Sequence, residues 1–242
     1  MEIARKILKL AKKKGVDQAE VFFSQTTTSS FSTVKHKICK GYHGFDSGFG
    51  LRVIIGKRMG FAYSTTHDLE SLVRRAVKIC KSSKPLEVEP ELPSKLKPGI
   101  SVFDKKLLEL NGEEVEVILN ECLEGMNKTK AKPVEVSFSY SLETFGIVNT
   151  EGIEAMDKTT ECMLSAEGKL GNTSYLDFQY SRKFELMPRE LGERVGRKVE
   201  DSFKAKTTKD DEFEVVLSPK AFGALLTFTV LPSFYADNVQ KH

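Results

Sequence analysis

The chain has 242 residues, of which 40% are hydrophobic and 29% are charged, an ordinary composition for a folded globular protein. Its net charge is only +3 and its basic residues form no dense stripe, so we expect no nucleic-acid partner. No apolar run reaches the roughly 20 residues that cross a bilayer, and the charged N-terminus does not resemble a signal peptide. Four widely spaced cysteines without a C-x-x-C pair then indicate reduced thiols in a cytoplasmic protein that binds no membrane.

The first expected element is an amphipathic helix of about a dozen residues that packs on a core. Ile3, Ile7 and Leu10 recur at helical spacing, and Gly15 follows as a C-terminal stop. Residues 17–66 have strand character, with two strand-like runs on either side of the Ser/Thr-rich tract Gln25–Ser30. We interpret this tract as a turn or as the solvent face of a strand, rather than as a phosphate site.

Residues 48–66, GFGLRVIIGKRMGFAYSTT, predict a β-hairpin with its turn at Gly56-Lys57-Arg58. The glycines in and around this segment do not match the G-x-x-x-x-G-K-[ST] phosphate loop. A helix should follow, with Thr66 or Asp68 as its cap. Its apolar face would consist of Leu69, Leu72, Val73, Ala76 and Ile79.

The second half of the chain predicts a similar order of elements. Asn111 and Glu114 indicate a capping box at the start of a helix. Strand-like runs follow at residues 134–142, 145–149 and 159–184, with a turn at 168–172. A last helix should start near Pro188, with Gly192 and Gly196 on one side, where they would allow close approach to a sheet.

These elements predict an α+β fold in a domain of residues 1–204. Its repeat-like halves, about 1–80 and 111–204, would each form an antiparallel sheet with helices on one face. Residues 19–24 resemble residues 134–139, which favours an internal duplication. A proline-rich strap over residues 81–100 would join the halves.

A second piece should begin after the charged segment 204–212 and occupy residues 212–242. Its apolar residues 213–217 predict a strand, and Ser218-Pro219 predict the cap and first position of a short buried helix over about 221–231.

Side chains with catalytic chemistry form no clear site in the sequence. His36, Cys39 and His43 lack a metal-ligand spacing that strand alternation would bring to one face. The nucleophile elbow G-x-S-x-G is missing. The carboxylates belong to patterns of solvated faces, namely Asp157, Glu161 and Glu167, and Glu113, Glu114 and Glu116. The residues alone therefore predict a soluble α+β protein with no visible active site.

Three segments of the chain nevertheless resemble the TldD/PmbA family, once called modulators of DNA gyrase. They are the hairpin at 48–66, NTEGIEAMDKTTE at 149–161, and VLSPKAFGALLTFTVLPSFYADNVQK at 216–241. The resemblance implies an N-terminal α+β domain followed by the start of a mostly β C-terminal domain, since family members are much longer. It also implies a metallopeptidase that pairs two kinds of subunit and cleaves unfolded peptides. TldD-like subunits carry a zinc motif, H-E-x-x-x-H, which PmbA/TldE-like subunits lack.

The resemblance also places the zinc motif on this chain. If Leu225-Leu226 match the apolar pair before the motif, its two histidines fall on Thr227 and Pro232 and its glutamate on Phe228. These residues supply neither zinc ligands nor a base for a metal-activated water. The resemblance therefore implies a PmbA/TldE-like chain with no catalytic residue and no metal of its own, and with zinc in a TldD-like partner.

Two functions follow as expectations. The first is a non-catalytic subunit of a TldD/TldE-type metallopeptidase that binds unfolded peptides and pairs with a zinc-bearing subunit; whether this chain itself is an enzyme stays open. The alternative is a non-enzymatic peptide-binding or scaffold protein that acts as a homodimer. Binding to nucleic acid or gyrase is disfavoured by the small net charge.

Overall fold

The computed structural model describes residues 1–34, 37–87, 90–96, 99 and 102–239, without the side chains of 34, 37–40 and 236–237. The chain divides into two compact units, Met1–Lys204 and Ala205–His242. His36, and the side chain of Cys39, lie outside the described part, so the structure does not test them as metal ligands.

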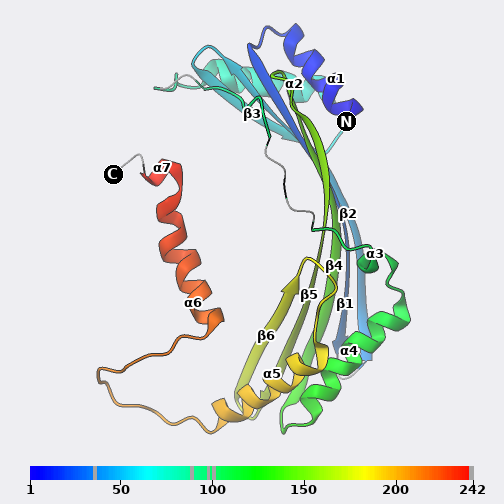
Figure 1. The fold of residues 1–242 in the computed structure, drawn as a ribbon, viewed down its shortest axis with the longest axis vertical. Coiled ribbons are helices and arrows are strands. Elements are labelled where there is room, and N and C mark those ends of the chain that lie inside the picture. The colour runs from blue at the N-terminus through cyan, green and yellow to red at the C-terminus, as the bar shows by residue number, and fades with distance from the viewer. Residues whose placement is uncertain (35–36, 88–89, 97–98, 100–101, 240–242) are drawn as a thin grey trace. The chain divides into compact units, whose positions relative to one another are not determined.

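The first unit is built on one six-stranded sheet with the order β3-β2-β1-β4-β5-β6, in which every neighbouring pair is antiparallel (Figure 1). The strands are β1 (Gln18–Val34), β2 (Lys37–Ile55), β3 (Arg58–Ser64), β4 (Lys132–Asn149), β5 (Glu154–Leu170) and β6 (Thr173–Ser181). The predicted α+β class is confirmed. The predicted hairpin is present as β2–β3, with Gly56 at a positive φ of 54° in its turn.

The prediction of separate sheets in the two halves was wrong, because β1 and β4 join them into one sheet. These strands pair from Glu20↔Asn149 to Val34↔Glu135. The tract Gln25–Ser30 forms no turn and continues β1 without a break. Likewise, the two strand-like runs at 134–142 and 145–149 are one strand, β4. Neither Gln25–Ser30 nor the link at 143–144 contains a Gly or Pro turn signal, and Thr fits a pleated strand well.

Four longer helices flank this sheet. They are α1 (Glu2–Lys13), α2 (Leu69–Ser82), α4 (Gly112–Asn127) and α5 (Pro188–Phe203), while α3 (Lys106–Glu109) is a short turn before α4. Asp68 caps α2 by accepting a hydrogen bond from the Ser71 N–H. The predicted capping box of α4 is present, with both Asn111–Glu114 hydrogen bonds.

Two hydrophobic cores lie between the helices and the sheet, one toward each end of the long strands (Figure 1). Helices α1 and α2 cover the first core, in which Val21, Leu51 and Val53 are fully buried. Helices α4 and α5 cover the second core, around the fully buried Phe138 and Leu164.

The contact between α4 and α5 depends on glycines. A Cβ on Gly192 would lie 1.9 Å from the Cys122 carbonyl oxygen, and one on Gly125 would lie 2.1 Å from the Arg189 carbonyl oxygen. We predicted that Gly192 and Gly196 allow approach to a sheet, and this was wrong. Gly192 meets the backbone of α4, and Gly196 meets the side chain of Thr129 just after it.

The segment between α2 and α3 is irregular and is fastened to the ends of several strands. The Leu92 N–H donates to Gln18 of β1, and Asn149 of β4 donates to the Pro93 carbonyl oxygen. Farther along, Val102 forms a parallel bridge with Thr159 of β5. The segment therefore passes β1, β4 and β5 in turn.

The second unit contains a short helical run with few buried side chains. It comprises α6 (Pro219–Leu225), a π-helical turn (Leu226–Val230), a 3-10 turn (Leu231–Phe234) and α7 (Ala236–Val239). Ser218 caps α6 as predicted, accepting a hydrogen bond from the Ala221 N–H. Two other predictions were wrong. Residues 213–217 form no strand, and the described residues of this unit (205–239) offer no other strand to pair with them. The helix is exposed rather than buried.

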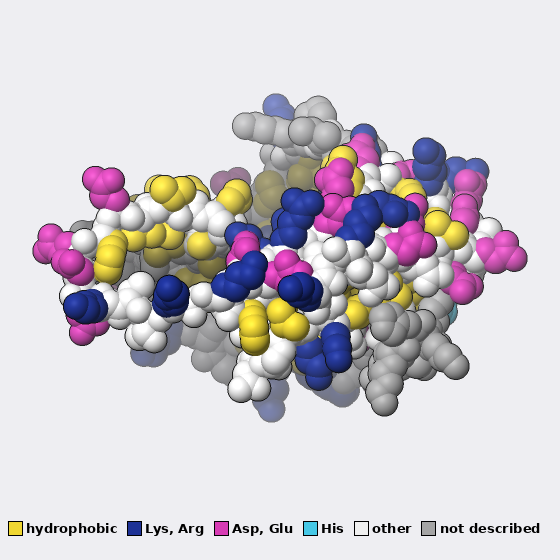
Figure 2. Space-filling model, turned by 90° about the horizontal axis from the view of Figure 1, so that it is seen from below, with side chains coloured by type: hydrophobic (Ala, Val, Ile, Leu, Met, Phe, Trp, Pro, Cys, Tyr) yellow, Lys and Arg dark blue, Asp and Glu magenta, His cyan; other side chains and the backbone are white. Residues whose placement is uncertain are grey.

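Charged side chains of both signs are interspersed on the side of the molecule seen in Figure 2, with hydrophobic side chains between them. This mixture agrees with the small net charge of the sequence. In the described part of the chain, no helix combines the length and hydrophobicity that a membrane span requires.

Candidate functional site on the open face of the sheet

Side-chain alternation gives the sheet one helix-covered face and one face that we call the open face. Val21 and Phe23 of β1 and Phe138 and Val148 of β4 point into the cores, so their strand neighbours point to the opposite side. On that side lie Phe22, Ser24 and Thr26 of β1 and the residues paired with them. The helices α1, α2, α4 and α5 all pack on the other side.

Aromatic side chains mark both outer strands of the open face. The outer strand β3 carries Met59, Phe61 and Tyr63, and the outer strand β6 carries Leu176, Phe178 and Tyr180. These side chains are 39–70% exposed in a sheet whose opposite face is well packed. Each strand thus repeats the spacing apolar-x-Phe-x-Tyr at one border of the same face.

A first hollow of about 370 Å³ lies over β1, β2 and β3. Its floor includes Gly48 and Gly50 of β2, which pair with Ser24 and Phe22 of β1. The absence of a side chain at Gly50 lets the Phe61 ring lie over it, 3.1 Å from where a Cβ would be. The walls include Phe22, Phe61 and Tyr63, with Asp46 as the one charged residue of the lining.

A second hollow of about 1010 Å³ lies over β4 and β5 and shares Phe22 with the first. Phe145, Ile147 and Met156 contribute apolar surface, and Leu96, Gly99 and Val102 of the segment between α2 and α3 also line it. The charged residues in its lining are Glu143, Asp157 and Arg182. The Phe22 and Phe145 rings lie 6.4 Å apart, so an aromatic pair separates the two hollows.

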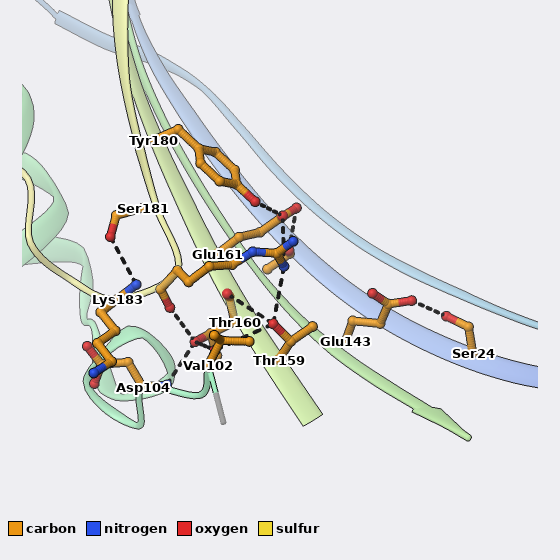
Figure 3. A network of polar contacts seen from close by, with 12 residues as sticks. Ser24, Val102, Asp104, Glu143, Thr159, Thr160, Glu161, Tyr180, Ser181 and Lys183 are labelled. Atoms are coloured by element: carbon orange, nitrogen blue, oxygen red, sulfur yellow. Dashed lines mark hydrogen bonds and ion pairs between the residues drawn. The ribbon is translucent and has the colours of Figure 1, made fainter. Parts of the chain in front are cut away.

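A polar network borders the second hollow (Figure 3). Glu161 accepts hydrogen bonds from the Tyr180 hydroxyl at 2.7 Å and from the Ser141 hydroxyl at 3.1 Å, and it forms an ion pair with Arg182 at 3.5 Å. Arg182 also donates to the Thr159 hydroxyl and lies 5.8 Å from the centre of the Tyr180 ring. Separately, Ser24 donates to Glu143 across the β1–β4 pair.

The environment of this network shifts two pKa values. Burial raises the pKa of the Tyr180 hydroxyl, and its hydrogen bond to Glu161 raises it further. The pKa of Asp104 is lowered, chiefly because its carboxylate accepts the Phe184 backbone N–H. Tyr180 is therefore a neutral hydrogen-bond donor at physiological pH, and the network holds the carboxylate of Glu161 in place.

Acidic side chains outnumber basic ones among the described side chains of the open face. The acidic residues are Glu20, Asp46, Glu135, Glu143, Asp157, Glu161 and Glu167, and the basic residues are Arg52, the pair Lys132 and Lys169 and, at the end of β6, Arg182. Each of the two arginines is paired with a glutamate, Arg52 with Glu20 and Arg182 with Glu161. The open face is thus acidic and aromatic, in a chain whose net charge is +3.

Several residues that the sequence offered as metal ligands or catalytic carboxylates do not lie together in the fold. His43 lies on the helix-covered face, where its Nδ1 lies 3.0 Å from the Ser29 hydroxyl. Glu114 serves the capping box, and Glu113 and Glu116 are exposed on α4. Within the described residues, no three His, Cys, Asp or Glu side chains form a group that could hold a metal ion.

The residues at the inferred zinc-motif positions lie in the second unit. The Thr227 hydroxyl donates to the Gly223 carbonyl oxygen one turn earlier at 2.8 Å, and Phe228 is 79% exposed. Pro232 lies in the following 3-10 turn. We considered these positions from the sequence but missed the network around Glu161. The available signal was period-two alternation in β6, which places Phe178 and Tyr180 on one face of that strand.

Comparison with known proteins shows which proteins part or all of the chain resembles. Residues 19–80 match the model of PmbA/TldA metallopeptidase domain 1. An uncharacterized protein from Methanocaldococcus jannaschii is 27% identical over 239 residues, which are 98% of this chain and 55% of the relative. The chain therefore spans about half the length of that relative.

Solved structures share the fold at low sequence identity. TldE from Thermococcus kodakarensis has a TM-score of 0.80 and 20% identity, with 99% of this chain and 56% of that chain covered. A putative modulator of DNA gyrase from Bacteroides thetaiotaomicron has a TM-score of 0.77 and 18% identity, over 93% of this chain and 55% of that one. Residues 19–80 thus resemble the first domain of the PmbA/TldA metallopeptidases, and the described chain shares the fold of these solved structures.

Proposed function

We propose that this chain belongs to a non-catalytic, TldE-like subunit of a TldD/TldE-type metallopeptidase that acts on unfolded peptides. In this proposal the zinc ion and the hydrolytic water belong to a TldD-like partner. This chain contributes surface that binds peptide and completes the site.

The observation that carries the proposal is the chemistry at Thr227, Phe228 and Pro232. Zinc in proteins takes nitrogen, sulfur or carboxylate ligands, and phenylalanine and proline side chains offer none. The threonine hydroxyl is already used within its own helix, as donor to Gly223. The described residues also contain no His, Cys, Asp and Glu group suited to a metal elsewhere.

The open face supports a role in holding peptide. Its two neighbouring hollows have aromatic walls and carboxylates but lack an activated nucleophile paired with a base. Such a surface can bind and orient a polypeptide while a partner supplies the chemistry.

The test combines this chain with a homologue that carries H-E-x-x-x-H. We expect co-purification of the two chains, zinc in the homologue only, and cleavage of an unfolded peptide by the complex. A Thr227→Val variant is the matched control, since it removes the hydroxyl but keeps the shape; it should leave zinc content and cleavage unchanged. Recovery of this chain only as a self-dimer that binds peptide would favour the homodimeric scaffold instead.

A further inference from the structure

The two hollows of the open face lie side by side and run across the strands. The first extends over β3, β2 and β1, the second over β4 and β5, and Phe22 lines both. Neighbouring strands are about 4.8 Å apart, so four spacings give a groove about 19 Å long. An extended chain rises about 3.3 Å per residue, and this length therefore fits about six residues.

The direction of the groove decides how a ligand is held. Backbone groups in the middle of a sheet already pair with neighbouring strands, so a peptide that lies across the face finds no free main-chain partners there. Recognition must then come from side chains in the hollows. This differs from adding a strand to a sheet edge, where main-chain hydrogen bonds give affinity with little sequence preference.

The side chains of the groove select for charge and for apolar surface. Asp46 lies in the first hollow, and Glu143 and Asp157 lie in the second. The basic residue in the two linings, Arg182, is paired with Glu161. Rings of Phe22, Phe61, Tyr63 and Phe145 line the same two hollows. Aromatic faces and carboxylates together favour Lys and Arg as well as apolar side chains.

We propose that this groove binds an extended, unfolded peptide segment that combines cationic and aromatic side chains. The inference rests on the proposed function and adds a substrate class to it. Carboxylates at Asp46, Glu143 and Asp157 contact the cationic side chains. Exposed rings of Phe22, Phe61 and Tyr63 in the first hollow contact the apolar side chains of the peptide.

The test measures binding of fluorescein-labelled, unstructured peptides to the purified chain by fluorescence anisotropy. One peptide alternates Lys and Phe, a second replaces Lys by Glu, and a third replaces Phe by Ser. We expect the Lys/Phe peptide to bind at least about tenfold more tightly than either other peptide, which corresponds to about 1.4 kcal/mol. Its affinity should fall when salt is raised from 50 to about 500 mM, because the charges are exposed to solvent.

Variants locate the binding site. Phe22→Ala should weaken binding of the Lys/Phe peptide by about tenfold, because Phe22 borders both hollows. Phe45→Ala is the matched control, since Phe45 is also an exposed aromatic residue of the sheet but alternates to the helix-covered face. Asp157→Asn should lower the salt dependence, whereas Glu116→Gln on α4 should not. Thermal unfolding of each variant checks that the fold is retained.

Three results would overturn the inference. Equal binding of all three peptides, or equal effects of Phe22→Ala and Phe45→Ala, would show that the groove does not select this class. Absence of any peptide binding would also refute it. None of these results would refute the proposed function, which is tested separately by co-purification with the zinc-bearing homologue and by the location of the zinc.

Discussion

The crossing of α4 and α5 allows a sharp prediction about stability. In Gly192→Ala, the new Cβ would lie 1.9 Å from the Cys122 carbonyl oxygen and 2.8 Å from the Met126 nitrogen. Both are backbone atoms of a helix, so no side chain can rotate away. Ordinary contact begins near 3.4 Å, and the two helices must therefore separate by about 1.5 Å.

The cost follows from the core beneath this crossing. Leu191 and Val195 of α5 are fully buried, and separation of the helices loosens their packing. Overpacking of this kind costs about 1–3 kcal/mol and occasionally more, while Ala gains about 1 kcal/mol over Gly in a helix. Because the clash is with helix backbone that cannot rotate away, we expect the overpacking cost to exceed this range, at about 3–5 kcal/mol. After the gain from Ala, the net loss in the free energy of unfolding is about 2–4 kcal/mol.

Thermal unfolding followed by circular dichroism measures this loss. For a chain of this size, 1 kcal/mol shifts the melting temperature by about 2–4 °C, so Gly192→Ala should melt roughly 5–15 °C below the unmodified chain. Gly112→Ala is the matched control, since Gly112 is also helical but has no neighbour within 4 Å of its would-be Cβ. Equal melting temperatures for the two variants would refute the reasoning.

Three further predictions concern caps, charges and thiols. Asn111→Ala removes the capping box of α4 and should cost about 1 kcal/mol in chemical denaturation, with no change if the box contributes nothing. Arg52→Met leaves the buried carboxylate of Glu20 without its cation, so it should cost about 1–3 kcal/mol, and the double variant with Glu20→Gln should recover part of that loss. Burial raises the pKa of the Cys122 thiol to about 12, so the folded state keeps a proton that the unfolded state loses above pH 9. Stability should therefore fall between about pH 9 and 12, and Cys122→Ala should reduce this slope; an unchanged slope would contradict it.

Local patterns predicted the local structure well. The hairpin of β2 and β3 has alternating apolar residues and a Gly at its turn, and the capping box at Asn111 depends on residues three positions apart. Such features depend only on residues that are close together in the sequence. The cap of α6 by Ser218 follows the same rule.

Long-range contacts were not available from these patterns. The pairing of β1 with β4 joins residues more than a hundred positions apart. Neither strand has a local sequence feature that indicates which strand it pairs with. The sequence indicated that Gly192 makes a close contact, but not that α4 rather than a sheet is its neighbour. Hydrophobicity alone predicted a buried helix after Ser218, although burial also requires something to cover it.

The candidate site was missed for a related reason. The sequence reading placed Asp157 and Glu161 on a solvated face, and they do lie on an exposed face. Their significance comes from Tyr180 and Phe145 on neighbouring strands, which only the sheet register places beside them.

The central claim is that the zinc of the proposed enzyme belongs to a partner and not to this chain. The most direct measurement is metal analysis, by mass spectrometry, of the purified chain and of its complex with an H-E-x-x-x-H homologue, together with a peptide-cleavage assay of each. We predict no stoichiometric zinc and no cleavage for this chain alone, and one zinc per complex with cleavage. Stoichiometric zinc and cleavage by this chain alone would contradict the account.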